Sequence, residues 1–559
     1  MTDFSIDLNN SIHTTTDSTT ALQIGGDDSL FIAANGSILS DGALSTAVNV
    51  TSASTAGFTK FTVYGRIIAN GACIDAEFGS ANIFVGSSAF LSGQIGIIAR
   101  GISVVTNCGT ITTGNVTQAI WHIAGAATDS LTVINTGNII AGLNRAAVQA
   151  SIGSDTVINS GFMQGIIDLG DGNDLYDGTS GTLTGRIGLG AGNDKGYGGA
   201  GSELFYGGLG DDVIDGGGGI DTIEFSIAGA TVDLRVTTQQ NTGDGLDTIA
   251  NVENVNGTSG KDIYNGSDGA NVLTGANDDD NLFGNGGNDV LDGGLGNDVL
   301  RGGEGSDTAR FSGTAAAAVD LNVAGPQETG YGTDTLDSIE NLTGGSGADH
   351  FTGNAIANVL DGRLGADQMS GGAGNDIYHV DNVGDRVIET ASGGTADRVY
   401  TSISYTLAAA VERLYASGSA ALSLTGNTLA NVIKGNAGHN RIDGGYGKDV
   451  LTGGMGNDTF VFRDRLGSTN VDQITDYNRT YDSLQLDNRY MSKLGPAGRL
   501  SSAQFVLGSA AKDADDHLIY DRAKGFLYYD PDGSGAAAKV LIAQFTNKAV
   551  LAYSEFTII

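Results

Sequence analysis

The sequence predicts an all-β protein: an N-terminal β-solenoid, then blocks of parallel β-roll separated by β-rich segments, then a C-terminal β module. Two observations predict this fold class. Residues 1–164 repeat short β-branched runs on either side of a glycine, and residues 165–462 contain blocks of a nine-residue unit with fixed glycine, aspartate and apolar places. The 89 glycines would suggest low complexity, but their nine-residue period indicates ordered turns.

The repeat in residues 1–164 is loose. Its runs centre on glycines that lie 21 to 29 residues apart, namely Gly36, Gly65, Gly86, Gly109, Gly137 and Gly161. Short strands at that interval suit the coils of a solenoid, in which stacking buries an apolar face that one coil could not bury alone. A β-sandwich is the competing interpretation.

The charge, the first residues and the cysteine count argue against several classes of protein. A net charge of −36 and a pI of 4.2 argue against a nucleic-acid partner. The opening MTDFSIDLNNSIHTTTDS has neither the basic nor the apolar region of a secretory signal peptide. No stretch is long and apolar enough to span a membrane. Cys73 and Cys108 are too few for a disulfide framework and either pair outside the cell or serve as small buried residues.

Catalysis in the solenoid needs a cluster of acid and base groups. The polar candidates there are sparse: Asp75, Glu77, Arg100, His122 and Arg145. His122 lies in the apolar run AIWHIAG, where packing is the more common role. The sequence contains no H-E-x-x-H and no G-x-S-x-G, so neither a zinc protease nor a serine hydrolase is supported.

The clearest nine-residue units run from Gly284 to Phe311 as GNGGNDVLD, GGLGNDVLR and GGEGSDTAR. Each places an aspartate sixth, at Asp289, Asp298 and Asp307, with an apolar residue two places later. Paired glycines permit the positive φ of a tight turn. The triplet around the apolar residue is a short strand with that side chain pointing inward.

Two such units make one coil, so aspartates eighteen residues apart should stack on one edge of the roll. Their carboxylates and the turn carbonyls supply the oxygen ligands that Ca²⁺ prefers. Without the ion the carboxylates repel one another, so we expect the roll to be loose and to fold as calcium binds.

The predicted calcium ligands are the aspartates at the sixth place of the units: Asp174, Asp194, Asp212, Asp221, Asp262, Asp280, Asp289, Asp298, Asp307, Asp349, Asp367, Asp376, Asp449 and Asp458. The strongest expected sites have aspartate on both sides: Asp194/Asp212, Asp262/Asp280, Asp280/Asp298, Asp289/Asp307 and Asp349/Asp367. Glu203 departs from the pattern and puts its site with Asp221 in doubt. Asparagine stands at the sixth place at Asn271, Asn358, Asn431 and Asn440, where we expect weaker sites.

The pattern divides the chain into a solenoid, four rolls, three β spacers and a C-terminal module. The boundaries are 1–164 for the solenoid; 165–225, 257–311, 344–381 and 426–462 for the rolls; 226–256, 312–343 and 382–425 for the spacers; and 463–559 for the module. The first spacer recurs as the second, which indicates an internal duplication. We expect the spacers to cover the ends of the rolls, with Asp247 and Asp334 in structural roles.

The C-terminal module holds aromatic residues and alternating strands. Its DPDGSG segment offers Asp530 and Asp532 as metal ligands, although a polar β-turn is the favoured interpretation. The chain ends in YSEFTII, an acidic residue followed by apolar ones.

From about residue 165 onward, these motifs resemble secreted RTX calcium-binding proteins of Gram-negative bacteria, and the tail from about Arg463 resembles the C-terminal module of serralysin-type peptidases. The resemblance implies export of an unfolded chain through a type I secretion machinery, guided by an uncleaved C-terminal signal, and folding outside the cell. The segment from Glu555 to Ile559 stands where that signal would end. The protease domain of serralysins is absent, so their activity is not implied. In texture, residues 1–160 are similar to filamentous-adhesin solenoids.

The sequence therefore predicts an extracellular protein that binds several Ca²⁺ ions and has a non-enzymatic role at the cell surface, in the matrix or in adhesion. A polysaccharide of the surface or matrix is a candidate partner. The main alternative is a lyase or epimerase that acts on polysaccharide through the N-terminal solenoid. A self-assembling surface layer is a third hypothesis.

Overall fold

The computed structural model describes residues 3–6, 12–14, 20–24, 28–40, 46–51, 59–76, 79–114, 117–225 and 227–559. Strands make up nearly all of its regular structure, which confirms the all-β prediction. The chain divides into two compact units, Met1–Gly305 and Ser306–Ile559. Within the described residues, no helix has the length and apolar character needed to cross a membrane.

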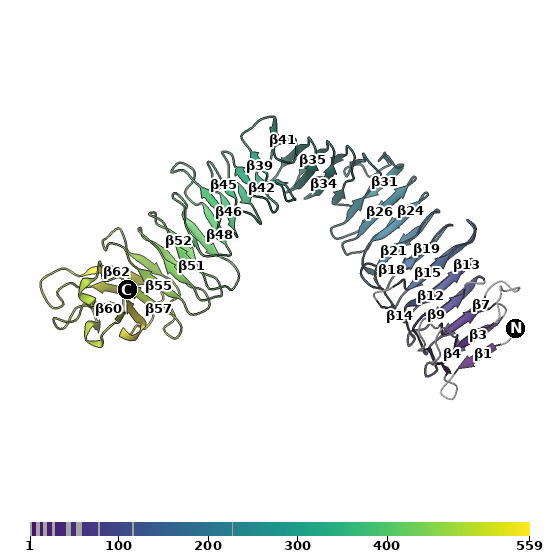
Figure 1. Ribbon diagram of the computed structural model, residues 1–559, viewed down its shortest axis with the longest axis horizontal. Coiled ribbons are helices and arrows are strands. Elements are labelled where there is room, and N and C mark those ends of the chain that lie inside the picture. The colour runs from purple at the N-terminus through teal and green to yellow at the C-terminus, as the bar shows by residue number, and fades with distance from the viewer. Residues whose placement is uncertain are drawn as a thin grey trace. The chain divides into compact units, whose positions relative to one another are not determined.

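The N-terminal part is a β-solenoid. Successive coils place one strand each in the same parallel sheet, and the pairings among the described residues of 3–164 are all parallel, so the competing sandwich interpretation is wrong (Figure 1). One sheet runs through β10 (Ala81–Val85), β13 (Ile102–Asn107), β16 (Ser130–Asn135) and β19 (Thr156–Asn159).

The solenoid core is mostly apolar, and a ladder of amides runs through it. Val105, Val133 and Val157 are in register on neighbouring coils and are fully buried. At the end of the same strands, Asn107 Nδ2 donates to Asn135 Oδ1 at 2.8 Å, and Asn135 Nδ2 donates to Asn159 Oδ1 at 2.9 Å. Stacked amides satisfy one another's polar atoms, so these buried turns carry no net charge.

The nine-residue units form a parallel roll with two short strands per coil. On one face β34 (Val272–Asn277) pairs with β36 (Val290–Leu295), and on the other β35 (Asn281–Gly286) pairs with β37 (Val299–Glu304). Residues eighteen apart are in register, as Leu273 with Leu291 shows, and both side chains are fully buried. The expected stacking interval is therefore confirmed.

The segment 226–256 ends one sheet of the first roll and continues another. Its strand β31 (Leu246–Ala250) pairs in parallel with β27 (Val213–Asp215) and antiparallel with β30 (Gln240–Asn241), which is the last strand of that sheet. In the other sheet, β32 (Asn254–Asn256) pairs with both β28 (Thr222–Glu224) and β34. The expectation that the spacer covers the end of a roll therefore agrees with the structure for one sheet and not for the other.

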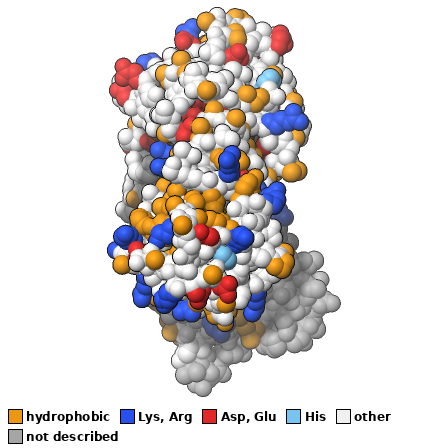
Figure 2. Space-filling view, turned by 90° about the vertical axis from the view of Figure 1, so that its left-hand side faces the viewer, with side chains coloured by type: hydrophobic (Ala, Val, Ile, Leu, Met, Phe, Trp, Pro, Cys, Tyr) orange, Lys and Arg blue, Asp and Glu red, His pale blue; other side chains and the backbone are white. Residues whose placement is uncertain are grey.

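The second unit repeats this construction and ends in the C-terminal module. Its last strand, β63 (Phe556–Ile558), pairs in parallel with β57 (Ser483–Leu486), and Phe556 and Ile558 are buried. Residues 463–559 hold eleven Lys and Arg and twelve Asp and Glu, so the acidity of the chain lies almost wholly before them. Lys and Arg side chains are prominent on the face drawn in Figure 2.

Candidate calcium sites

One carboxylate oxygen of each stacked aspartate ties two coils together. The backbone N–H of Asp262 donates to Asp280 Oδ1 at 2.8 Å, and that of Asp280 donates to Asp298 Oδ1 at 2.9 Å. The same bond joins Asp194 to Asp212 at 2.9 Å and Asp349 to Asp367 at 2.8 Å. The aspartates therefore form a ladder along one edge of the roll.

We call each residue of this ladder a rung. In many rungs the second carboxylate oxygen is buried and accepts no hydrogen bond. This holds for Oδ2 of Asp174, Asp194, Asp221, Asp280, Asp367, Asp376, Asp449 and Asp458. Burial raises the pKa of Asp280 and of Asp174 to about 8, and that of Asp194 to about 6. A buried charged oxygen without a partner is costly unless a cation compensates it.

The glycine at the first place of a unit keeps open a small space lined by oxygens. A Cβ at Gly275 would lie 2.1 Å from Asp280 Oδ2 and 2.8 Å from the carbonyl oxygen of Gly293, on the next coil. A Cβ at Gly344 would lie 2.0 Å from Asp349 Oδ2 and 2.8 Å from the carbonyl oxygen of Gly362. Carboxylate and carbonyl oxygens that converge in this way fit Ca²⁺, a hard cation with oxygen ligands.

All fourteen predicted ligands are buried, and within a roll they alternate between its two edges, because each coil contains two nine-residue units. In four of the five all-aspartate pairs, both residues belong to the same compact unit, Met1–Gly305 or Ser306–Ile559, and the bond described above joins them. In the fifth pair, Asp289 belongs to the first compact unit and Asp307 to the second. Asp289 Oδ1 accepts from the N–H of Asn271 at 2.8 Å, and the N–H of Asp307 donates to Glu340 Oε2 at 2.8 Å. Glu203 keeps its place in the ladder, since its N–H donates to Asp221 Oδ1 at 2.7 Å.

The asparagines at the sixth place are satisfied by the protein itself. Asn271 Oδ1 accepts from the N–H of Ser267 at 2.7 Å, and its Nδ2 donates to the carbonyl of Glu253 at 2.6 Å. Asn358, Asn431 and Asn440 likewise accept from the N–H four residues earlier. The amide groups at these positions are thus paired within the protein, and weaker calcium sites there stay a prediction.

The sequence pattern did not identify ladder residues that lack a glycine-rich turn before them. The ladder also includes Asp155, Asp385, Asp397, Asp472 and Asp482, and the glutamates Glu253, Glu340 and Glu412. Each added aspartate is followed two residues later by an apolar residue buried in the core, as Asp472 is by Ile474. That shorter signal, an aspartate before a one-residue gap and a core side chain, would have found them.

Most rungs contributed by the inserted loops are capped by their own loop. The hydroxyl of Thr242 donates to Asp247 Oδ2, and that of Thr329 donates to Asp334 Oδ2. Asp385 Oδ2 accepts from two N–H groups, and Asp482 Oδ2 accepts from the N–H of Asn478 at 2.7 Å. The structural role expected for Asp247 and Asp334 agrees with this capping.

Among the described residues, the remaining polar candidates include a histidine packed in the solenoid core and an aspartate in a polar turn. His122 is fully buried, with Nε2 2.9 Å from the carbonyl oxygen of Gly101 and Nδ1 3.8 Å from Asp155 Oδ1, and burial lowers its pKa. Glu77 lies outside the described residues. Asp532 Oδ2 accepts from the N–H of Ala537 at 2.9 Å, as in a polar turn. Both cysteines are free thiols.

Comparison with known proteins agrees with the repeat chemistry. The family model of the RTX calcium-binding nonapeptide repeat (4 copies) matches residues 189–223, 256–291, 274–309, 343–378 and 425–460. No curated protein matches the chain. Among solved structures, the crystal structure of extracellular lipase LipA from Serratia marcescens matches with 16% sequence identity and a TM-score of 0.15, over 56% of this chain and 44% of that one.

The chain thus spans less than half the length of that lipase, and a likeness this low carries no argument about function. The repeats alone identify the relationship, since their period, turn glycines, stacked aspartates and buried apolar places all occur in the structure. This chain contains RTX calcium-binding nonapeptide repeats, which the family model matches in stretches between residues 189 and 460.

Proposed function

We propose that this is a secreted protein whose rolls fold when they bind Ca²⁺ outside the cell, and that its role at the cell surface or in the matrix is non-enzymatic. The observation that carries the proposal is the row of buried Oδ2 atoms without partners, several of which lie beside a glycine whose place a larger residue could not take, as Asp280 Oδ2 does beside Gly275. We propose as ligands the fourteen aspartates predicted from the sequence.

Isothermal titration of the full chain with Ca²⁺ tests this function. We expect several ions to bind per chain, with release of protons, because the carboxyl groups whose pKa burial raises must be deprotonated to hold the metal. A titration to millimolar Ca²⁺ that gives neither binding heat nor proton release would contradict the proposal.

We propose export through a type I channel, with residues 555–559 as part of its signal. Phe556 is fully buried and Glu555 Oε1 accepts from Arg479 Nε at 2.8 Å, so in the folded unit this segment is packed into a sheet. A transporter would read the segment only in an unfolded chain. Calcium-dependent folding after export would satisfy that condition.

Deleting residues 554–559 should therefore retain the protein inside the producing cell. The matched control is Leu484→Ala, because Leu484 is fully buried and pairs with Phe556 in the same sheet, so it weakens that sheet but leaves the terminus intact. Secretion of the deletion variant, or equal retention of both variants, would contradict a signal in these residues.

A row of side chains on the outer face of the solenoid supports a polysaccharide partner. Trp121 is half-buried and in register with Gln149, which is in register with Asp168. A groove beside this row is lined by Gln118, Gln149, Asp168, Arg145 and Arg186 among others. An aromatic face with amide and charged groups suits a sugar ring, whereas the burial of His122 leaves this groove without that base.

Trp121 is the single tryptophan and is in register with Gln149, which lines the groove, so its fluorescence is the probe of binding there. We expect alginate or dextran fragments to change its emission, and Gln149→Ala to weaken that change. No shift with either polymer would contradict polysaccharide binding here.

A further inference from the structure

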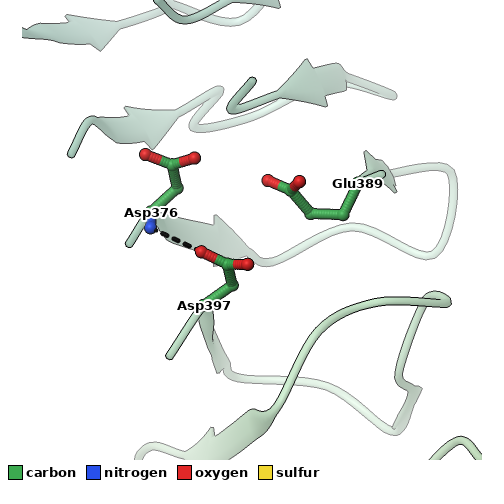
Figure 3. A group of neighbouring side chains, drawn as sticks. All are labelled: Asp376, Glu389 and Asp397. Atoms are coloured by element: carbon green, nitrogen blue, oxygen red, sulfur yellow. Dashed lines mark hydrogen bonds between the residues drawn. The ribbon is translucent and has the colours of Figure 1, made fainter. Parts of the chain in front are cut away.

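One group of carboxylates is not explained by the repeat pattern. Asp376 precedes β46 (Ile377–Val380), Asp397 precedes β48 (Arg398–Thr401), and Glu389 follows β47 (Arg386–Ile388) in the inserted loop between them. One carboxylate oxygen from each residue lies within 4.8 Å of those of the other two. Figure 3 shows Glu389 pointing toward the two aspartates.

The two aspartates are stacked rungs. Ile377 and Arg398, which follow them, are in register, and the N–H of Asp376 donates to Asp397 Oδ1 at 2.8 Å (Figure 3). Both aspartates are fully buried, and Oδ2 of each accepts no hydrogen bond. Asp397 therefore differs from the loop rungs Asp385 and Asp482, whose second oxygens are capped by N–H groups of their own loops.

Glu389 occupies a glycine place. It stands eighteen residues after Gly371, where an ordinary coil has the first glycine of the next unit, as Gly293 follows Gly275. In an ordinary coil this position brings only its carbonyl oxygen to the space beside the aspartate. Here it adds a third carboxylate, and the neighbouring charges that raise the pKa of Asp376 are Glu389 and Asp397.

We propose that Asp376, Glu389 and Asp397 hold a Ca²⁺ ion more tightly than the two-carboxylate sites of the rolls. The inference rests on the proposed function only for the identity of the ion. Three carboxylates match a divalent cation in charge, and affinity for Ca²⁺ rises with the number of charged ligands. The site also fastens the inserted loop to the roll, because Glu389 comes from that loop.

Tb³⁺, which replaces Ca²⁺ at oxygen sites and luminesces when a nearby tyrosine is excited, provides a selective readout. The hydroxyl of Tyr378 donates to Glu389 Oε1, so its ring lies beside this site. In the full chain we expect the first Tb³⁺ equivalent to luminesce, and Tyr378→Phe to remove most of that signal while the number of Ca²⁺ ions bound stays unchanged.

Glu389→Gln and Glu389→Asp should both abolish the early phase and weaken the tightest Ca²⁺ site by roughly tenfold or more. Glu340→Gln is the matched control, because Glu340 is also a ladder glutamate in this unit but is not part of the three-carboxylate group. Far-UV circular dichroism in Ca²⁺ checks that each variant folds.

An unchanged tightest site in both Glu389 variants would overturn this inference while leaving the proposed function standing. Equal loss in Glu340→Gln would also overturn it, because the effect would then belong to the ladder as a whole. Failure of the unmodified chain to bind either ion would instead contradict the proposed function itself.

Discussion

At the scale of a single residue, each ladder aspartate has two separate tasks. One oxygen accepts the N–H of the preceding coil, as Asp298 does from Asp280 at 2.9 Å. The other faces the oxygen-lined space kept open by a glycine, as Asp280 Oδ2 does beside Gly275. The first task stacks the coils and the second leaves a buried oxygen that suits a cation, so we propose that calcium binding and folding are coupled in one side chain.

Asp298→Ala should weaken calcium binding by roughly tenfold or more, because it removes a charge from an all-carboxylate pair. Asn440→Ala should change calcium affinity much less, because Asn440 bonds to Asn436 through both its Oδ1 and its Nδ2. Calorimetric titration compares the two. Equal calcium affinities would contradict this ranking.

Gly344→Ala should impair calcium binding in the third roll, because the added Cβ would lie 2.0 Å from Asp349 Oδ2. Gly467→Ala is the matched control in the same unit, since nothing lies within 4 Å of a Cβ there. The number of ions bound per chain, measured by equilibrium dialysis, should fall only for Gly344→Ala. A full complement of ions in that variant would show that the space beside Asp349 is not a site.

The calcium-free fold should become less stable as the pH rises. Burial raises the pKa of Asp212 and Asp221 to about 7 and that of Asp280 to about 8, from an ordinary value of 3.8. The folded state therefore binds protons more tightly than the unfolded state, and this stabilisation is lost as the pH climbs from about 4 to about 8.

Urea unfolding in the presence of a chelator at pH 5.5, 6.5 and 7.5 measures this effect. We expect the free energy of unfolding to decrease along that series, and added Ca²⁺ to reverse the decrease at the upper end. A free energy that rises with pH would mean that the ladder carboxylates are stabilised by something other than protons or a cation.

The sequence predicted the ladder where the glycine-rich turn accompanies the aspartate, because turn and carboxylate then repeat together. It failed where only one of these features is present. Asp397 comes 21 residues after Asp376 and so breaks the interval of eighteen, and Glu389 stands in a glycine place. Whether such residues reach the ladder depends on the path of the inserted loop, and no local sequence pattern specifies that path.

At the scale of the element, the spacer 226–256 extends one sheet and ends another. The strand β32 pairs in parallel with β28 and β34, whereas the sheet that contains β31 ends at its antiparallel partner β30. A solenoid tolerates such loops because each coil needs to match only the coils beside it. The duplicated spacer therefore adds surface without interrupting the core.

The stability of a coil should depend on its inward apolar residue. Leu291→Ala should lower the free energy of unfolding by about 2–5 kcal/mol in Ca²⁺, because Leu291 is fully buried and its truncation removes apolar contacts and leaves a cavity in the core. Leu295→Ala, at the exposed end of the same strand, should change it by less than about 0.5 kcal/mol. Equal effects in urea unfolding would contradict this packing.

At the scale of the whole molecule, the chain combines two ways of stacking coils. Residues 79–114 and 117–164 use apolar packing and a neutral ladder of Asn107, Asn135 and Asn159, which requires no ion. The rolls use a ladder of buried carboxylates, which requires one. We therefore expect calcium removal to unfold the rolls and to spare the solenoid.

Far-UV circular dichroism of the full chain during a calcium titration tests this account most directly. It predicts a partial β signal in chelator, from the solenoid, and a cooperative gain as Ca²⁺ is added that chelator reverses. A β signal that is complete without calcium would contradict the account, because the rolls would then be held by packing alone.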